Sequence, residues 1–264
     1  MGKVTYWDGI AILQLIDFPI ILVAAIFIWK RTGWRSGSKI WRYGVTLSLI
    51  RIAGSVSSLI SINNPSYDVE VAIAVCQLIG LAPLLLTFIG LLRQIDIEKK
   101  TPPRAIKLIT LVTFIGLILG IAGVSSSDSD SNNSYKPGAL AKAAMGIFLA
   151  VFAVFLLLAL WLFYQLSFSL RRFQKKLFLA IALSTPFLAA RLLYSALADY
   201  TAFRAFALGG NATVYLCMAV LEEIVAMGIT MALGVSAVME SDFVRLQMER
   251  TPVGQGEELD LERK

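Results

Sequence analysis

Residues 213–238 read TVYLCMAVLEEIVAMGITMALGVSAV, an apolar stretch with two adjacent glutamates near its middle. A stretch of this length is enough to cross a lipid bilayer, which needs about 20 mainly apolar residues. Carboxylates at that depth are costly, and ionisable side chains inside spans usually face the interior of a helix bundle and mark a functional site. Glu222 and Glu223 are therefore the starting point for both the fold and the function.

The rest of the chain has the composition of a multispanning membrane protein. Of the 264 residues, 57% are hydrophobic and 16% are charged, and the mean hydropathy is +0.73. These values lie outside the range of soluble domains. Seven stretches meet the length requirement, at about 7–29, 41–61, 69–92, 106–124, 140–168, 177–198 and 213–238. We predict an all-α bundle of seven transmembrane helices over residues 1–240, followed by a polar, disordered cytosolic tail over residues 241–264.

Basic residues predict how this bundle is oriented. They cluster after the first, third and fifth spans and in the C-terminal tail, whereas the opposite side holds only Lys3, Lys136, Lys142 and Arg204. The positive-inside rule then puts the N-terminus outside or in the lumen and the C-terminus in the cytosol. Two glycosylation acceptors, Asn132 in Asn132-Asn133-Ser134 and Asn211 in Asn211-Ala212-Thr213, fall on the predicted lumenal side. The net charge of +6 therefore indicates membrane topology rather than a nucleic-acid partner.

Missing residue types exclude many kinds of chemistry. The chain has no histidine, which excludes histidine-ligated haem, histidine zinc sites and the Ser-His-Asp triad. The two cysteines, Cys76 and Cys217, lie in apolar runs and suggest packing rather than a disulfide or a metal cluster. The sequence has neither a phosphate-binding glycine loop nor the Asp-rich motifs that hold magnesium diphosphates. We therefore expect no metal, nucleotide or redox cofactor.

Polar side chains from several spans are predicted to form one layer. Counting the rise of the helix from the outer boundary puts them roughly 9–15 Å deep. The layer contains Asp17, Arg51, Gln77, Arg191, Glu222 and Glu223. Helical phase puts Tyr194 on the same face as Arg191 and Tyr215 on the same face as Glu222. These eight residues are the predicted site.

The charges of this layer do not balance. Asp17, Glu222 and Glu223 face only two arginines, so one acid lacks a partner. Loss of hydration and a like-charged neighbour both favour the neutral form of a carboxyl group, so we predict that either Glu222 or Glu223 keeps its proton near neutral pH. A proton held in a dry pocket makes that group a potential general acid. The alternative interpretation is purely structural, with each arginine pairing with a carboxylate to join helices.

The chain resembles small fungal seven-span membrane proteins in its topology. The resemblance rests on Arg51 in the segment Leu-Ile-Arg-Ile-Ala-Gly, on Arg191-Leu-Leu-Tyr194 and on the acidic centre of the seventh span. That group includes uncharacterised families, the lipid-translocating exporter family and the membrane-bound terpene cyclases of meroterpenoid pathways, including the ascochlorin and ascofuranone type.

The resemblance to the cyclases implies a multi-pass protein of the endoplasmic reticulum that acts in secondary metabolism. Its substrate would be a lipophilic, prenylated and often epoxidised molecule that enters from the bilayer. An isomerase- or lyase-type reaction would start with protonation by Glu222 or Glu223, with Asp17 as a second carboxylate. Arg51 and Arg191 would set the protonation, and Tyr194 and Tyr215 would face the carbocation with their rings.

Two other functions use the same layer. A lipid translocator or receptor-like protein would use it as a conformational switch between helices. A proton-coupled transporter would use the spare carboxyl as a relay, although the sequence shows no inverted repeat.

Overall fold

The computed structural model describes residues 6–33, 41–62, 73, 76, 79–96, 100–125, 138–167, 170–201 and 211–244. Every regular element among these residues is a helix. In chain order the helices are α1 (Tyr6–Thr32), α3 (Arg42–Ser61), α5 (Leu81–Ile95), α6 (Pro103–Ser125), α7 (Ala139–Leu166), α8 (Arg172–Tyr200), α9 (Ala212–Tyr215), the π-helical η1 (Leu216–Val220) and α10 (Leu221–Val238). The prediction of an all-helical protein is confirmed for this part of the chain.

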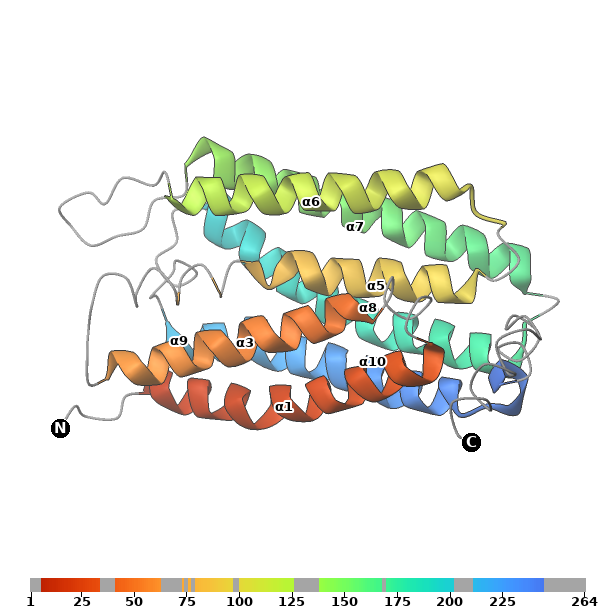
Figure 1. The fold of residues 1–264 in the computed structure, drawn as a ribbon. Coiled ribbons are helices and arrows are strands. Elements are labelled where there is room, and N and C mark those ends of the chain that lie inside the picture. Colours follow the sequence, from red (N-terminus) through yellow and green to blue (C-terminus); the bar gives the residue numbers. More distant parts are fainter. Residues whose placement is uncertain are drawn as a thin grey trace, which may run out of the picture.

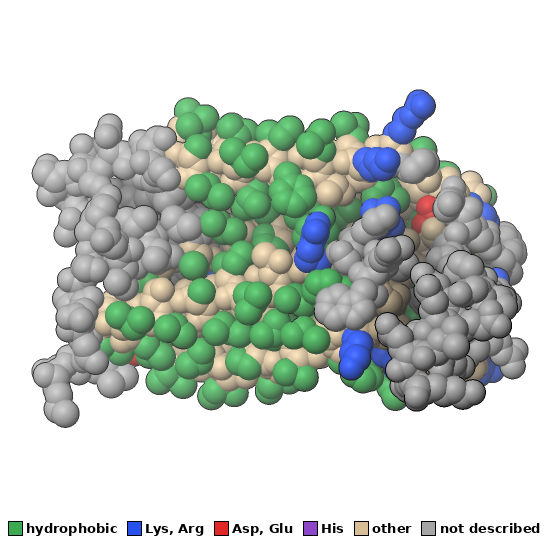
Figure 2. All heavy atoms as spheres, in the orientation of Figure 1, with side chains coloured by type: hydrophobic (Ala, Val, Ile, Leu, Met, Phe, Trp, Pro, Cys, Tyr) green, Lys and Arg blue, Asp and Glu red, His purple; other side chains and the backbone are tan. Residues whose placement is uncertain are grey.

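Six helical stretches of the described chain are long and apolar enough to cross a membrane. They are Tyr6–Thr32, Arg42–Ser61, Arg104–Gly123, Ala139–Leu166, Arg172–Tyr200 and Ala212–Val238. The third predicted span, 69–92, corresponds to the shorter apolar helix α5, which has 15 residues. A bilayer environment agrees with the surface, because the side chains that cover the long helices in Figure 2 are mostly hydrophobic.

Successive long helices run in alternate directions and lie side by side (Figure 1). The closest pairings are α8 with α10, α1 with α3, and α6 with α7. Helix α5 is enclosed by α3, α6, α7 and α8, and all of its residues except Arg93 are buried. The core is therefore centred on a short helix, and the longer helices present an apolar outer face.

Small residues allow α10 to approach its neighbours closely. A Cβ atom on Gly234 would lie 2.8 Å from the ring of Trp41 and 3.2 Å from Ile28. Eight residues earlier in α10, the carbonyl oxygen of Ala226 accepts a hydrogen bond of 3.1 Å from the Ser184 hydroxyl of α8. Small residues and interhelical hydrogen bonds are the usual means of helix association in membranes. They hold α10 between α1, α3 and α8.

The end of the bundle where α10 stops carries the Lys and Arg side chains that are visible in Figure 2. The first residues of the predicted tail, 241–264, also lie at this end of the bundle. Residues 241–244 form a further helical turn rather than the start of a disordered segment. The reason is Phe243, which is buried and packs against Phe173 of α8 with ring centroids 5.7 Å apart. The remainder of the predicted tail, 245–264, lies outside the described residues.

Candidate functional site

An ion pair between α3 and α10 forms the centre of the site. The Nε atom of Arg51 donates a hydrogen bond of 2.6 Å to Oε1 of Glu223, and Nη2 of Arg51 donates to Oε2. The exposed fractions are only 3% for Arg51 and 2% for Glu223. A guanidinium and a carboxylate that meet through two parallel hydrogen bonds form the strongest kind of side-chain ion pair. These two hydrogen bonds join α3 to α10.

A second arginine approaches the same carboxylate from α8. The Nε atom of Arg191 lies 3.8 Å from Oε2 of Glu223, and its Nη1 donates a hydrogen bond of 2.7 Å to the Ser195 hydroxyl. Its guanidinium carbon lies 5.8 Å from the centre of the Tyr194 ring, within the range of a cation–π contact. One buried carboxylate thus connects three helices, α3, α8 and α10.

A glycine makes room for the Arg51 side chain. Gly80 immediately precedes α5, and a Cβ atom at this position would stand 2.8 Å from Cζ of Arg51. No real Cβ atom makes a contact that short, so any larger residue at position 80 would force the guanidinium to move. Gly80 is a site residue that the sequence analysis missed, because a single glycine among apolar residues gives no signal of what faces it.

The neighbouring acid, Glu222, is placed differently. It is half-buried, and its Oε2 atom is buried without a hydrogen-bond partner among the described residues. It lies one helical turn before Ala226, on the side of α10 that meets α8. The site therefore contains one carboxylate that is fully paired and a second carboxyl with unused hydrogen-bonding capacity.

A π-helical turn, η1, comes directly before the two glutamates. Its backbone closes with a hydrogen bond from the N–H of Leu221 to the carbonyl of Leu216, five residues back. Each residue of a π turn advances less around the axis than an α-helical residue, so Tyr215 and Glu223 both face the interior, where both are buried. Such turns occur frequently at functional sites. The sequence analysis assumed an uninterrupted α-helix here and missed this element.

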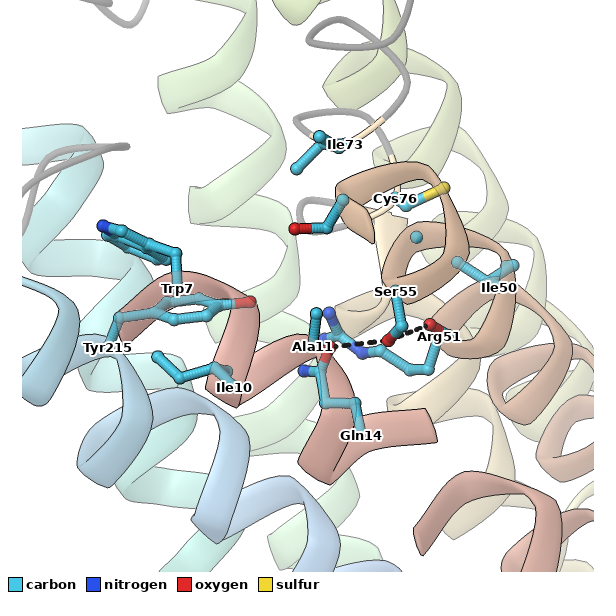
Figure 3. Close-up of a pocket in the computed structure, with 12 residues that line it drawn as sticks. Trp7, Ile10, Ala11, Gln14, Ile50, Arg51, Ser55, Ile73, Cys76 and Tyr215 are labelled. Carbon is cyan, nitrogen blue, oxygen red and sulfur yellow. Dashed lines mark hydrogen bonds between the residues drawn. The ribbon is translucent and has the colours of Figure 1, made fainter. Parts of the chain in front are cut away.

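A small pocket lies between α1, α3 and Tyr215 of α9 (Figure 3). One wall consists of Trp7 and Tyr215, whose ring centroids are 5.3 Å apart. Opposite them, Ser55 donates a hydrogen bond of 3.1 Å to the side-chain oxygen of Gln14, next to Arg51. The pocket also reaches Ile73 and Cys76.

The volume of this pocket is about 30 Å³. That is room for one or two water molecules, whereas pockets for drug-sized ligands measure about 300–1,000 Å³. Arg51 and Tyr215 line the pocket, but Glu222, Glu223, Arg191 and Tyr194 do not. The pocket therefore has room for water beside the ion pair and is not lined by the acids.

Five of the eight predicted site residues come together in the structure. They are Arg51, Arg191, Glu223, Tyr194 and Tyr215, and the rings of the two tyrosines are 6.3 Å apart. Glu222 lies beside them. Asp17 is half-buried on α1 and forms no hydrogen bond or ion pair with the described residues, so it does not join the layer there. Gln77 lies outside the described residues.

Metal binding has no support in the described part of the chain. Nowhere in it do three His, Cys, Asp or Glu side chains come close enough together to hold a metal ion.

The sequence matches one known protein family along most of its length. Residues 4–240 match the family described as a domain of unknown function, DUF7702. No curated protein and no solved structure matches the chain. The matched region begins before α1 and ends after α10, so it contains the whole site. The chain belongs to the DUF7702 family.

Proposed function

We propose that this protein is a receptor-like or lipid-translocating membrane protein in which the layer of Arg51, Glu223 and Arg191 acts as a conformational switch. The observation that carries this proposal is the arrangement of charges. One buried carboxylate is shared by guanidinium groups from two other helices, beside a pocket with room for water alone. A ligand or lipid that draws Arg51 away from Glu223 would change how α3 is joined to α10.

The energetics favour a switch over simple adhesion. A buried ion pair gives little net stability, because the cost of removing both charges from water offsets their attraction. Such a pair can therefore be exchanged for another arrangement of similar free energy, provided that each charge keeps a partner. Here Arg191 remains as a second partner for Glu223 when Arg51 moves.

Cys76 offers a direct test, because it lines the pocket next to Arg51. In a Cys217→Ala variant, the rate at which a maleimide modifies Cys76 reports the opening of the pocket. We expect Arg51→Gln to raise this rate at least several-fold. With Arg51 in place, we expect vesicles that contain a translocated lipid to raise the rate as well. A Cys76→Ala variant that keeps Cys217 is the control. Equal rates in all lipids and in Arg51→Gln would contradict the proposal.

Lipid translocation needs a separate assay. Phosphatidylcholine vesicles containing the protein and a fluorescent phosphatidylcholine are exposed to dithionite, which quenches only the outer leaflet. Translocation predicts loss of more than about half of the fluorescence, and Arg51→Gln should change the rate. A rate equal to that of protein-free vesicles would leave the receptor-like interpretation as the only form of this proposal.

A terpene cyclase is the second candidate, and Glu222 supports it. Its buried Oε2 atom has no hydrogen-bond partner among the described residues, which suits a carboxyl group that holds a proton. In the reaction, this group would protonate an epoxide oxygen as its C–O bond breaks. An alkene would attack the resulting carbocation, and loss of a proton from carbon would end the sequence. The substrate requires a pocket larger than the one described.

Glutamine variants test the cyclase function. Detergent-solubilised protein should convert an epoxy-prenyl substrate without added cofactor, and Glu222→Gln should abolish turnover. Asp17→Asn is the matched control, because Asp17 lies apart from the layer in the described chain. Failure of the unsubstituted protein to convert any epoxidised prenyl compound would remove this candidate.

We also propose seven spans, with α5 and the residues before it as the third, the N-terminus outside or lumenal and the C-terminus cytosolic. The alternating helix directions and the basic side chains near the end of α10 support this topology. Glycosylation at Asn132 and protease sensitivity of a C-terminal tag in sealed microsomes would test it. Imaging of a fluorescent fusion would test the expected location in the endoplasmic reticulum.

A further inference from the structure

The π-helical turn contains one more residue than an α-helix of the same length, and this additional residue decides which of the two consecutive glutamates faces Arg51. Because a π turn closes with an i→i+5 hydrogen bond instead of i→i+4, it fits one more residue into the same length of helix. In the present arrangement this additional residue lies in η1, between Tyr215 and Glu223. If the segment after Tyr215 were α-helical, residue 222 would occupy the place that residue 223 occupies now.

The flanking parts of the helix are fixed by contacts. At the outer end, the Asn211 side chain caps α9 by accepting a hydrogen bond of 3.0 Å from the N–H of Thr213. The ring of Tyr215 packs against those of Trp7 and Tyr194. At the inner end, the carbonyl of Ala226 accepts from Ser184 of α8. A change of register between these two ends therefore requires the additional residue to move along the helix, not to disappear.

The segment between the fixed ends tolerates such a movement. Residues 216–221 read Leu-Cys-Met-Ala-Val-Leu, so a shift of one residue exchanges apolar side chains for other apolar side chains. Only the two acids change their surroundings greatly, and each can replace the other chemically.

We propose that η1 is a register switch: when the π turn moves inward past Glu223, Glu222 takes the place of Glu223 against Arg51. Arg51 stays paired in both registers, and the two glutamates exchange the paired and the spare position. This inference deepens the proposed function, since it rests on the layer being a switch and states how the switch is built. It also explains why two acids, and not one, stand at this level.

Deletion of one residue tests the register directly. Removal of Cys217, which lies in η1 and is exposed, leaves a continuous α-helix in which Glu223 still faces Arg51 and no additional residue remains to move. We expect Glu223→Gln to lower the melting temperature in detergent at least twice as much in this background as in the full-length chain. In the full-length chain Glu222 can replace the lost acid. Equal losses in both backgrounds would overturn the register switch.

A second comparison does not depend on the deletion variant folding. In the full-length chain, the double variant Glu222→Gln/Glu223→Gln should lose more than twice the sum of the losses of the two single variants, because each acid can replace the other. Additive losses would overturn the register switch. Glu222→Gln alone is the matched control, and its effect in the full-length chain should be small because Glu223 keeps its place against Arg51.

The test of the register switch and the test of the proposed function can give different outcomes. Additive losses together with a lipid-dependent change in Cys76 modification would overturn the register switch while the proposed function stands. Non-additive losses without any such change would support the two registers and count against the proposed function.

Discussion

Two of the ion pairs among the described residues, Arg51–Glu223 in the centre of the bundle and Lys176–Glu240 just after the end of α10, differ in their access to water. In the central pair, the exposed fractions of the Arg51 and Glu223 side chains are 4% and 2%. At the end of the bundle where α10 stops, Lys176 of α8 pairs with Glu240, and the corresponding fractions are 32% and 20%. Lys176 also donates a hydrogen bond of 2.7 Å to the Ser236 hydroxyl. Similar chemistry thus occurs in two very different environments.

The difference teaches that the location of an ion pair decides what its loss costs. An exposed charge that loses its partner regains water, so an exposed pair adds little to stability. A buried charge that loses its partner has no water to regain, and leaving it unpaired in the bilayer interior is costly. Loss of the central pair should therefore change the conformation of the bundle, whereas loss of the pair at the end of the bundle should change its stability only slightly.

The largest expected effect is the removal of all carboxyl groups from the central layer. Glu222→Gln/Glu223→Gln leaves two buried guanidinium groups without an acid, and we expect a loss of about 3–5 kcal/mol in the free energy of unfolding. Unfolding in mixed micelles with increasing dodecyl sulfate measures it. The matching double variant at the end of the bundle, Lys176→Gln/Glu240→Gln, should lose far less. Similar losses for the two double variants would remove the contrast between the pairs.

A smaller loss is expected when the space for Arg51 is filled. Gly80→Ala puts a Cβ atom against the guanidinium, and overpacking of this kind costs about 1–3 kcal/mol. The control is Gly228→Ala, where no atom lies within 4 Å of the new Cβ. That change should be neutral or slightly stabilising, because alanine favours a helix over glycine by about 0.5–1 kcal/mol. Equal effects at both positions would mean that Gly80 does not position Arg51.

Hydropathy alone predicted the helices with good accuracy, because the length of an apolar run is a direct property of the sequence. The predicted span 41–61 is α3, Arg42–Ser61, and the predicted span 213–238 is α9, η1 and α10 together. The third predicted span, 69–92, ends before α5 does, because the apolar run ends at Arg93 whereas the helix continues to Ile95, and most of its first half lies outside the described residues. The Asp96 carboxylate then accepts hydrogen bonds from the N–H groups of Lys100 and Thr101, which closes the turn after α5.

The detailed pairing in the site could not be predicted, since it depends on how each helix is rotated about its axis. Depth and charge put Asp17 in the layer, but α1 gives it no ion pair with the described residues. For the two glutamates, an ideal α-helix puts both within one arc facing the interior. The π turn selects Glu223, and the letters Leu-Cys-Met-Ala-Val contain no pattern that predicts a π turn.

Between the two ion pairs, a hydrogen bond joins α8 to α10 without any charge. Ser184→Ala removes the donor to the Ala226 carbonyl, and we expect a loss of about 0.6 kcal/mol, the average for interhelical hydrogen bonds in membranes. The control is Thr185→Val, because among the described residues the Thr185 hydroxyl donates to the Ile181 carbonyl of its own helix and to no other helix. Unfolding in mixed micelles again measures both variants. A larger loss for Thr185→Val would show that this contact does not join the helices.

The smallest expected effect is at the end of the bundle, and it depends on pH. The hydrogen bond from Lys176 lowers the pKa of Glu240, and the charges of Lys176 and Arg172 act in the same direction. Because the pKa is lower in the folded state, the stabilisation is complete above the pKa of the unfolded chain and is lost as the pH falls through the folded value. The melting temperature of the unsubstituted protein should therefore fall more than that of Glu240→Gln between neutral and acidic pH. High salt should remove this difference, because salt screens exposed charges, whereas it should leave the central pair unaffected. A difference that persists in high salt would mean that the Lys176–Glu240 pair is shielded from water like the central one.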